Sequence, residues 1–277
     1  MKFNMFIPNE EEKKLILTAL ETIDILRQGY YYKNEKLIQL KTKSRNNFNN
    51  AIVYSTNLTE KFDLESKFSG LNKCTIQVMD CDSFEAALKL NMPLVMNFAN
   101  PYRPGGGFFY GAKAQEESLC RSSTLYLSLS SEAANEVYLY NNQHKSSVNS
   151  DYIILSPDVC VFRNSKYELL DNPYYVSVIS VSAPENCGII LSKNELEEIM
   201  IKRIRNMLNV ASKHGYRSLV LGAWGCGAFG NDANSVASCF YDVLINENYS
   251  HWFDNVIFSI LSDKEKLEVF QKQFNTI

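Results

Sequence analysis

GGGFFYGAKAQEE, residues 105–117, places three consecutive glycines shortly before a glutamine and two adjacent glutamates. Without Cβ atoms, the backbone at Gly105, Gly106 and Gly107 can adopt positive φ and approach a ligand closely. The preceding residues 93–100 predict a buried strand ending at a polar residue, and residues 115–123 predict the start of a helix. A strand, a glycine loop and a helix in this order gather backbone N–H groups around an anionic group.

A second glycine-rich segment, LGAWGCGAFGN at 221–231, directly follows a predicted strand at 218–221. Strands and helices alternate from residue 71 onward, which favours an α/β sandwich with a largely parallel sheet. The other expected strands are 74–79, 94–98, 152–155, 160–163, 174–182 and 256–261. The expected helices are 83–90, 115–130 with a break at 122–123, one near 131, one between Ser192 and Gly215, 232–245 and one from 263. Ligands of such sheets bind at the carboxyl ends of the strands, so both glycine loops are expected on one rim.

Composition sets the broad class of protein. The 277 residues are 45% apolar, and the net charge is −3, without a basic stripe of the kind that a nucleic-acid binder carries. Seven scattered cysteines have no Cys-x-x-Cys spacing, which indicates reduced thiols. None of the three histidines lies at metal-ligand spacing from another or from a cysteine, so no metal or cofactor is expected. The absence of a signal-type or membrane-length apolar run predicts a cytoplasmic protein.

Residues 1–70 are expected to form a helical N-terminal extension packed on a main domain at 71–277. Asn9 can cap a helix that Gly29 ends, and its apolar stripe contains Leu15, Ala19, Ile23 and Leu26. A polar segment follows from residue 33 to residue 70, with a short strand at 51–54. The cluster Tyr30–Tyr32 is interpreted as packing on the main domain, although stacking on a base is an alternative.

The two glycine segments together resemble the signature of poly(ADP-ribose) glycohydrolases, in which a triple glycine precedes Gln-Glu-Glu. Asn97-Phe98-Ala99-Asn100 and residues 115–121 resemble the microbial branch of that family. The resemblance extends from about Thr18 to the last strand. It implies a macrodomain-like, three-layer α/β/α sandwich with a mixed, largely parallel sheet and a helical N-terminal extension.

The resemblance also implies an activity, namely hydrolysis of the ribose–ribose O-glycosidic bond of poly(ADP-ribose) or of ADP-ribosylated proteins, with release of ADP-ribose. Glu117 would be the general acid and base, Glu116 would contact the ribose, and Gln115 would support the loop. No metal, cofactor, membrane or nucleic acid is implied. The implied substrate-binding residues are Asn100, Gly105, Gly106, Gly107, Gln115, Glu116, Gly225, Cys226, Gly227, Ala228 and Phe229.

Several alternatives remain open at this stage. The glutamates could be favourable charges at a helix N-terminus, and Cys226 could suggest a nucleophile, although no histidine is nearby in the sequence. The protein could bind ADP-ribose without turnover, or it could hydrolyse mono-ADP-ribosyl linkages. Adjacent helical residues point roughly 100° apart, so Glu116 and Glu117 are not expected to face the same atom. The residue that stacks on adenine is not identified, and Tyr30–Tyr32 and Phe240 are candidates.

Overall fold

The computed structural model describes residues 7–40, 50–55, 73–146, 148–187 and 191–274. Its centre is a seven-stranded sheet in which four of the six neighbouring pairs are parallel. The expected mixed, largely parallel sheet is therefore confirmed. In spatial order the strands are β3 (Ile52–Tyr54), β6 (Ile153–Arg163), β7 (Leu169–Val181), β5 (Leu94–Phe98), β8 (Ser218–Leu221), β9 (Asn255–Ser259) and β4 (Thr75–Met79).

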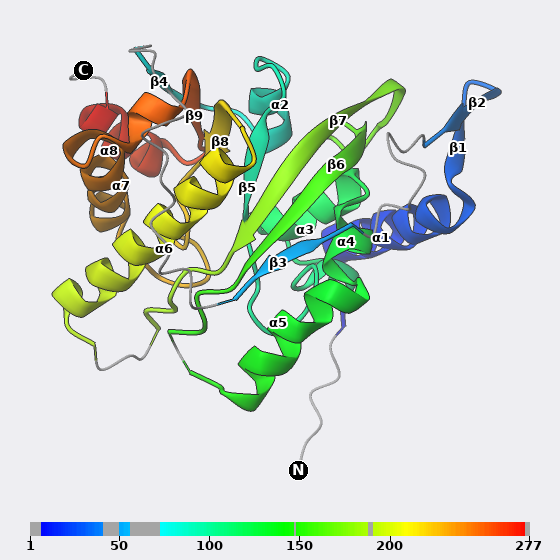
Figure 1. Cartoon of the computed structure of the whole chain (residues 1–277). Helices are drawn as coiled ribbons and strands as arrows, with labels where there is room; N and C mark the ends of the chain where they lie inside the picture. The colour runs from blue at the N-terminus through cyan, green and yellow to red at the C-terminus, as the bar shows by residue number, and fades with distance from the viewer. Residues whose placement is uncertain (1–6, 41–49, 56–72, 147, 188–190, 275–277) are drawn as a thin grey trace.

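Helices cover both faces of the sheet (Figure 1). Successive strand residues face opposite sides: Leu94 and Met96 belong to one hydrophobic cluster, and Val95 between them belongs to another. The first cluster is completed by α6 (Lys193–Lys213), α7 (Ala233–Tyr241) and α8 (Lys264–Phe274). The second is completed by α1 (Glu10–Gln28), α2 (Ser83–Ala87), α3 (Gln115–Ser122), α4 (Leu125–Leu129) and α5 (Glu132–Gln143). The three-layer sandwich is confirmed.

Local sequence signals start and stop these helices. Asn9, Asp82 and Ser192 each form a capping box at the start of α1, α2 and α6. The predicted break between α3 and α4 is at Ser123, which is extended (φ −151°) and forms a bridge with Val161 of β6.

Several predicted boundaries are wrong, and β7 begins at Leu169 rather than at the expected residue 174. The strands expected at 152–155 and 160–163 are one continuous strand, β6, because an irregularity between Ser156 and Val159 absorbs the residues between them. The helix expected at 83–90 ends at Ala87. The helix expected at 232–245 is α-helical only to Tyr241 and then continues as a π-helical segment, Asp242–Asn246.

The N-terminal segment packs on the main body through α1 and a hairpin of β1 (Tyr30–Lys33) and β2 (Lys36–Gln39). Tyr31 is 4% exposed, and its ring centre is 6.0 Å from that of Phe162. Both Tyr31 and the fully buried Phe240 are therefore core residues, and the suggestion that they stack on adenine is wrong. β3 pairs with β6 at the edge of the main sheet. The boundary at residue 70 stays a prediction, and much of the polar segment 33–70 lies outside the described residues.

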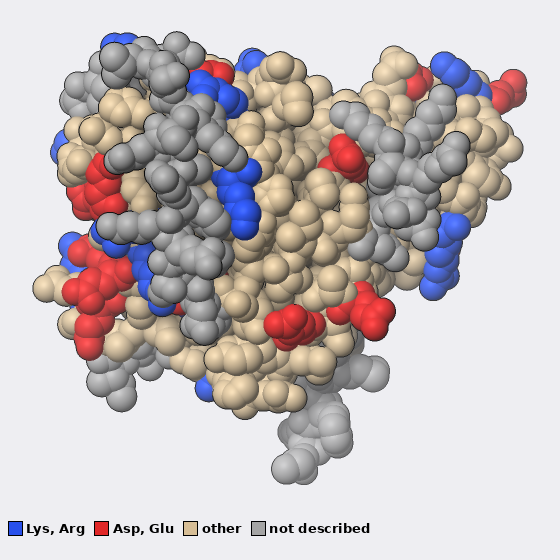
Figure 2. Space-filling model, in the orientation of Figure 1, with Lys and Arg blue, Asp and Glu red and all other residues tan. Residues whose placement is uncertain are grey.

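The strands β4, β5, β7, β8 and β9 run parallel and end at one rim of the sheet. The glycine loops at 105–107 and 222–231 leave this rim from β5 and β8, as predicted. On the face drawn in Figure 2, basic and acidic side chains are interspersed. Within the described ranges, none of the helices has the length and apolar character needed to cross a bilayer.

Candidate active site

A cavity of about 610 Å³ opens at this rim of the sheet. Residues 113–119, which follow the first glycine loop and begin α3, and residues of the second glycine loop line it, so the two sequence segments converge on one site. Of the residues predicted from the sequence, those in the lining are Asn100, Gln115, Glu116, Glu117, Gly225, Gly227, Ala228 and Phe229. Gly105, Gly106, Gly107 and Cys226 are not in the lining.

The triple glycine is packed directly against the two glutamates. Gly106 has a φ of +54°, and a Cβ atom on it would lie 2.5 Å from Glu117 Oε1 and 3.1 Å from Glu116 Oε2. Only glycine fits at this position without displacing a carboxylate. Both carboxylates therefore pack against Gly106, but they accept hydrogen bonds from different amides, Glu116 from Asn100 and Glu117 from Gly107.

Glu117 has one carboxylate oxygen fixed and one free. Its Oε1 accepts a hydrogen bond from the amide of Gly107 at 2.7 Å. Its Oε2 is buried and has no hydrogen-bond partner among the described residues. The side chain is 6% exposed and lines the cavity. A carboxyl group held by one oxygen can exchange a proton with a ligand through the other.

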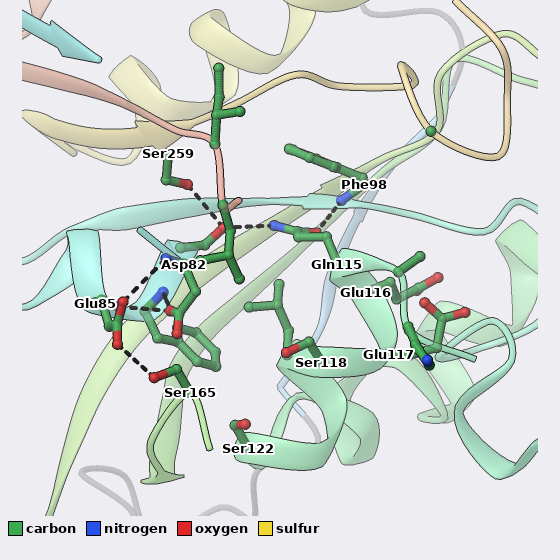
Figure 3. Close-up of a pocket in the computed structure, with 18 of the residues that line it drawn as sticks. Asp82, Glu85, Phe98, Gln115, Glu116, Glu117, Ser118, Ser122, Ser165 and Ser259 are labelled. Atoms are coloured by element: carbon green, nitrogen blue, oxygen red, sulfur yellow. Dashed lines mark hydrogen bonds between the residues drawn. The ribbon is translucent and has the colours of Figure 1, made fainter. Parts of the chain in front are cut away.

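Glu116 has both oxygens occupied. Oε2 accepts from the amide of Asn100 at 2.7 Å, and Oε1 accepts from Asn97 Nδ2 at 3.3 Å. Burial raises the pKa of Glu116 to about 8, and the negative charge of Glu117 adds to the rise, whereas these hydrogen bonds oppose it. The two glutamates lie side by side at the first turn of α3, apart from Ser118 and Ser122 of the same helix (Figure 3).

Gln115 does not support the glycine loop as the resemblance implied. Its Oε1 accepts from the amide of Phe98 at 2.9 Å, and its Nε2 donates to Ser83 Oγ at 3.0 Å (Figure 3). The same Nε2 also donates to the carbonyl of Met96 at 2.8 Å. The side chain thus joins the end of β5 to the start of α2. This ties the start of α3 to the rim of the sheet.

Four residues of the second glycine loop have amides without a hydrogen-bond partner among the described residues. The N–H groups of Gly225, Gly227, Ala228 and Phe229 donate no hydrogen bond within the described part of the chain. The amide of Cys226 between them donates to the carbonyl of Ala223 at 3.2 Å. All four of these residues line the cavity, together with Ala223 and Trp224 of the same segment. Converging backbone N–H groups form an anion-binding concavity.

The shape of this loop depends on close packing around Gly225. Gly225 has a φ of +75°, and a Cβ atom on it would lie 2.5 Å from Asn231 Nδ2 and 2.6 Å from Ala183 Cβ. Asn231 donates to the carbonyls of Pro184 and Gly225, and Trp224 Nε1 donates to the carbonyl of Val181 at 2.9 Å. The loop is therefore fixed to the end of β7.

The side chain of Cys226 takes no part in the site. It is 9% exposed, and its Sγ contacts the carbonyl of Trp224. Burial raises the pKa of this thiol to about 12, so almost no thiolate forms at neutral pH. This supports the interpretation that Cys226 is not a nucleophile.

Sequence reasoning missed several residues of the site. Asp82 and Ser83, at the start of α2 just after β4, line the cavity, and Asn97 contacts Glu116. The signal for the first two was available, because β4 ends at the same rim as β5 and β8. Among the described residues there is no group of three or more His, Cys, Asp or Glu side chains that could hold a metal ion.

A mostly parallel sheet between two helical layers, with paired glutamates and an amide-lined loop on one rim, defines a macrodomain-like protein. The model of the microbial-type PARG catalytic domain, where PARG is poly(ADP-ribose) glycohydrolase, matches residues 19–164. The chain belongs to the microbial-type PARG family.

Solved structures agree with this assignment. A poly(ADP-ribose) glycohydrolase from Thermomonospora curvata is 30% identical, and the match covers 95% of this chain and 100% of that chain with a TM-score of 0.82. The same glycohydrolase bound to the inhibitor ADP-HPD matches with the same values. A poly(ADP-ribose) glycohydrolase from Deinococcus radiodurans in complex with ADP-ribose is 33% identical, with 82% of this chain and 95% of that chain covered and a TM-score of 0.74. The comparison with curated proteins found no match.

Proposed function

We propose that Glu117 is the general acid and base with which this poly(ADP-ribose) glycohydrolase cleaves the ribose–ribose O-glycosidic bond and releases ADP-ribose. The observation that carries the proposal is the free Oε2 of Glu117, which is buried at a cavity that is also lined by four residues with unpaired amides. The substrates proposed are poly(ADP-ribose) and ADP-ribosylated proteins. The cytoplasmic location expected from the sequence stays a prediction.

The anion-binding loop accounts for substrate binding. The amides of Gly225, Gly227, Ala228 and Phe229 would hold the diphosphate of the terminal ADP-ribose unit, since they are preorganised and otherwise unpaired. The ring of Phe229 would pack on the terminal ribose. Asn100 and Glu116 line the cavity on the side of α3 and would contact the ribose hydroxyl groups. The anomeric carbon would then lie next to Glu117.

The chemical steps need one carboxyl group in two roles. Protonated Glu117 donates the proton on Oε2 to the departing ribose hydroxyl oxygen as the C–O bond breaks. The neighbouring diphosphate offsets the positive charge that develops on the terminal ribose. The ionised Glu117 then removes a proton from water as the water oxygen bonds to the anomeric carbon. The net change is the addition of one water molecule across the glycosidic bond, and Glu117 regains its proton.

Glu117→Gln tests the assignment, because the amide keeps the size of the side chain and can still accept from Gly107. We expect the kcat for polymer hydrolysis to fall by about 10²- to 10⁴-fold, while calorimetry shows that the affinity for ADP-ribose changes little. The matched control is Glu132→Gln, in the exposed first turn of α5, which should leave both quantities unchanged. Full activity of Glu117→Gln would show that another group is the acid.

A comparison of substrates distinguishes the proposed function from two alternatives, hydrolysis of mono-ADP-ribosyl linkages and ADP-ribose binding without turnover. Automodified polymer and a mono-ADP-ribosylated protein should be compared as substrates of the unaltered protein. Release of ADP-ribose from the polymer is the expected result. Release only from the mono-modified protein would indicate hydrolysis of mono-ADP-ribosyl linkages, and binding of ADP-ribose without release from either would indicate a binding module.

A further inference from the structure

Arg121, in the last turn of α3, is a fully buried cation without an acidic partner. Its side chain is 0% exposed, and no carboxylate of the described residues forms an ion pair with it. One guanidinium nitrogen, Nη2, donates to the carbonyl of Ala112, whereas Nε and Nη1 have no partner. The guanidinium carbon lies 5.7 Å from the ring centre of Tyr167. Burial of an unpaired charge destabilises a fold, so its presence needs an explanation.

The carbonyl that Arg121 holds belongs to the segment between the triple glycine and α3. The amide of Ala112 donates to the carbonyl of Gly107 at 3.3 Å, and the amide of Gly107 donates to Glu117 Oε1 at 2.7 Å. A Cβ atom on Gly107 would lie 2.5 Å from Ala112 Cβ, so these two residues are in close contact. Hydrogen bonds therefore run from Arg121 through Ala112 and Gly107 to Glu117.

The position of Arg121 is itself fixed from two other elements. Its backbone carbonyl accepts from Thr22 Oγ1 of α1 at 2.9 Å, and Thr22 is fully buried. Tyr167, at the tip of the β6–β7 hairpin, donates to Ser118 Oγ at 3.3 Å, which holds the ring near the guanidinium. Arg121 is thus held by α1 and by the β6–β7 hairpin, while its guanidinium binds the segment between the triple glycine and α3.

We propose that Arg121 is a positioning residue for Glu117: by holding Ala112 it fixes the Gly107 amide, which orients the carboxyl group and keeps Oε2 free. This inference rests on the proposed role of Glu117. Arginine suits the position because its planar group can lie over the Tyr167 ring and donate at its edge to a carbonyl. An apolar residue of similar length would remove the destabilising charge and also release the loop.

A double-mutant cycle between Arg121→Met and Glu117→Gln tests the proposal. Arg121→Met should lower kcat for polymer hydrolysis by about 10- to 100-fold, since small displacements of a catalytic group have effects of this size. The affinity for ADP-ribose should change by less than about threefold, because the diphosphate loop is untouched. In the Glu117→Gln background, Arg121→Met should have no further effect on kcat. An unchanged kcat in the single variant, or independent effects that multiply in the double variant, would overturn the proposal.

Arg203→Met is the matched control for loss of a buried guanidinium. Arg203 is 2% exposed on α6, and its partners are Asp151, Ser182 and Val148, none of which belongs to the glycine loop. In the double variant, the fold reduction in kcat caused by Arg203→Met should multiply with the fold reduction caused by Glu117→Gln, whatever the size of the Arg203→Met effect. If both arginine variants behave alike in the cycle, Arg121 has only a structural role.

Hydrogen exchange of the Gly107 amide gives a second readout that does not depend on activity. Exchange should accelerate in Arg121→Met, while exchange of the Leu221 amide in the sheet should not change. If Arg121→Met fails to fold, Arg121→Lys carries the same cycle and the same exchange measurement. Full activity of Glu117→Gln alone would refute the role of Glu117, and the exchange result would still decide whether Arg121 fixes Gly107.

Discussion

Glu116 is 2% exposed, and burial raises the pKa of its carboxyl group from the ordinary 4.5 to about 8. Two hydrogen bonds, from Asn100 and Asn97, favour the ionised form but do not offset the loss of hydration. In the folded protein an ionised Glu116 is therefore unfavourable over most of the neutral range. A residue kept where it opposes stability is typical of a functional site, and Glu116 lies beside the proposed acid.

Glu116→Gln should stabilise the protein, and the gain should depend on pH. Because the folded-state pKa is raised, the wild-type protein loses stability as pH rises from about 4.5 to about 8, and loses no more above that. The difference in free energy of unfolding between Glu116→Gln and wild type should be near zero at pH 4 and grow to roughly 2–4 kcal/mol at pH 9. Urea unfolding at several pH values measures it.

The control for this titration is Glu198→Gln, on the exposed side of α6. Its effect on the free energy of unfolding should stay small at every pH. A difference for Glu116→Gln that does not vary between pH 4 and pH 9 would mean that Glu116 is not held in its neutral form by burial.

At the scale of elements, the glycine loop and α3 form one unit. The helix supplies both carboxylates in its first turn, and the loop packs against them with no room for a side chain at Gly106. The C-terminal end of the same helix supplies Arg121, which holds the segment that joins loop to helix. Loop and helix therefore depend on each other for their geometry, and neither defines the site alone.

Gly106→Ala should disturb this unit. The methyl group would meet Glu117 Oε1 at 2.5 Å, so the carboxylate or the loop must move. We expect stability to fall by about 1–3 kcal/mol and kcat to fall by at least about 10²-fold. Thermal unfolding and polymer-hydrolysis kinetics measure the two effects.

Gly215→Ala is a control that separates the steric effect of an added Cβ atom from the cost of a positive φ. Gly215 has a φ of +76°, but a Cβ atom there would meet nothing within 4 Å. This control should lose about 1 kcal/mol of stability from the left-handed backbone and keep its kcat. If Gly106→Ala retained kcat within about threefold, the tight contact between loop and carboxylates would not matter for catalysis.

At the scale of the whole molecule, patterns of local sequence predicted most of the fold. Alternating strands and helices, capping residues such as Asn9 and Ser192, and strand-end glycines are all short-range signals, and the structure confirms the elements that they predict. The placement of both glycine loops at one rim follows from parallel strands alone.

Long-range packing accounts for what the sequence did not predict. The two strands predicted at 152–155 and 160–163 form one strand because both pair with β7, and no local pattern specifies this pairing. The role of Gln115 depends on the distance between the end of β5 and the start of α2. The packing of Glu116 and Glu117 against Gly106 depends on the shape of the glycine loop. The burial of Arg121 likewise depends on packing with α1 and the β6–β7 hairpin, which no local pattern specifies.

A crystal structure with ADP-ribose tests the central claim most directly, because the claim concerns the position of one ligand between two loops. The diphosphate oxygens should lie within about 3 Å of the amides of Gly225, Gly227, Ala228 and Phe229. The anomeric carbon of the terminal ribose should lie beside Glu117, with its hydroxyl group within hydrogen-bond distance of Oε2. A diphosphate bound away from these amides, or a terminal ribose out of reach of Glu117, would contradict the account.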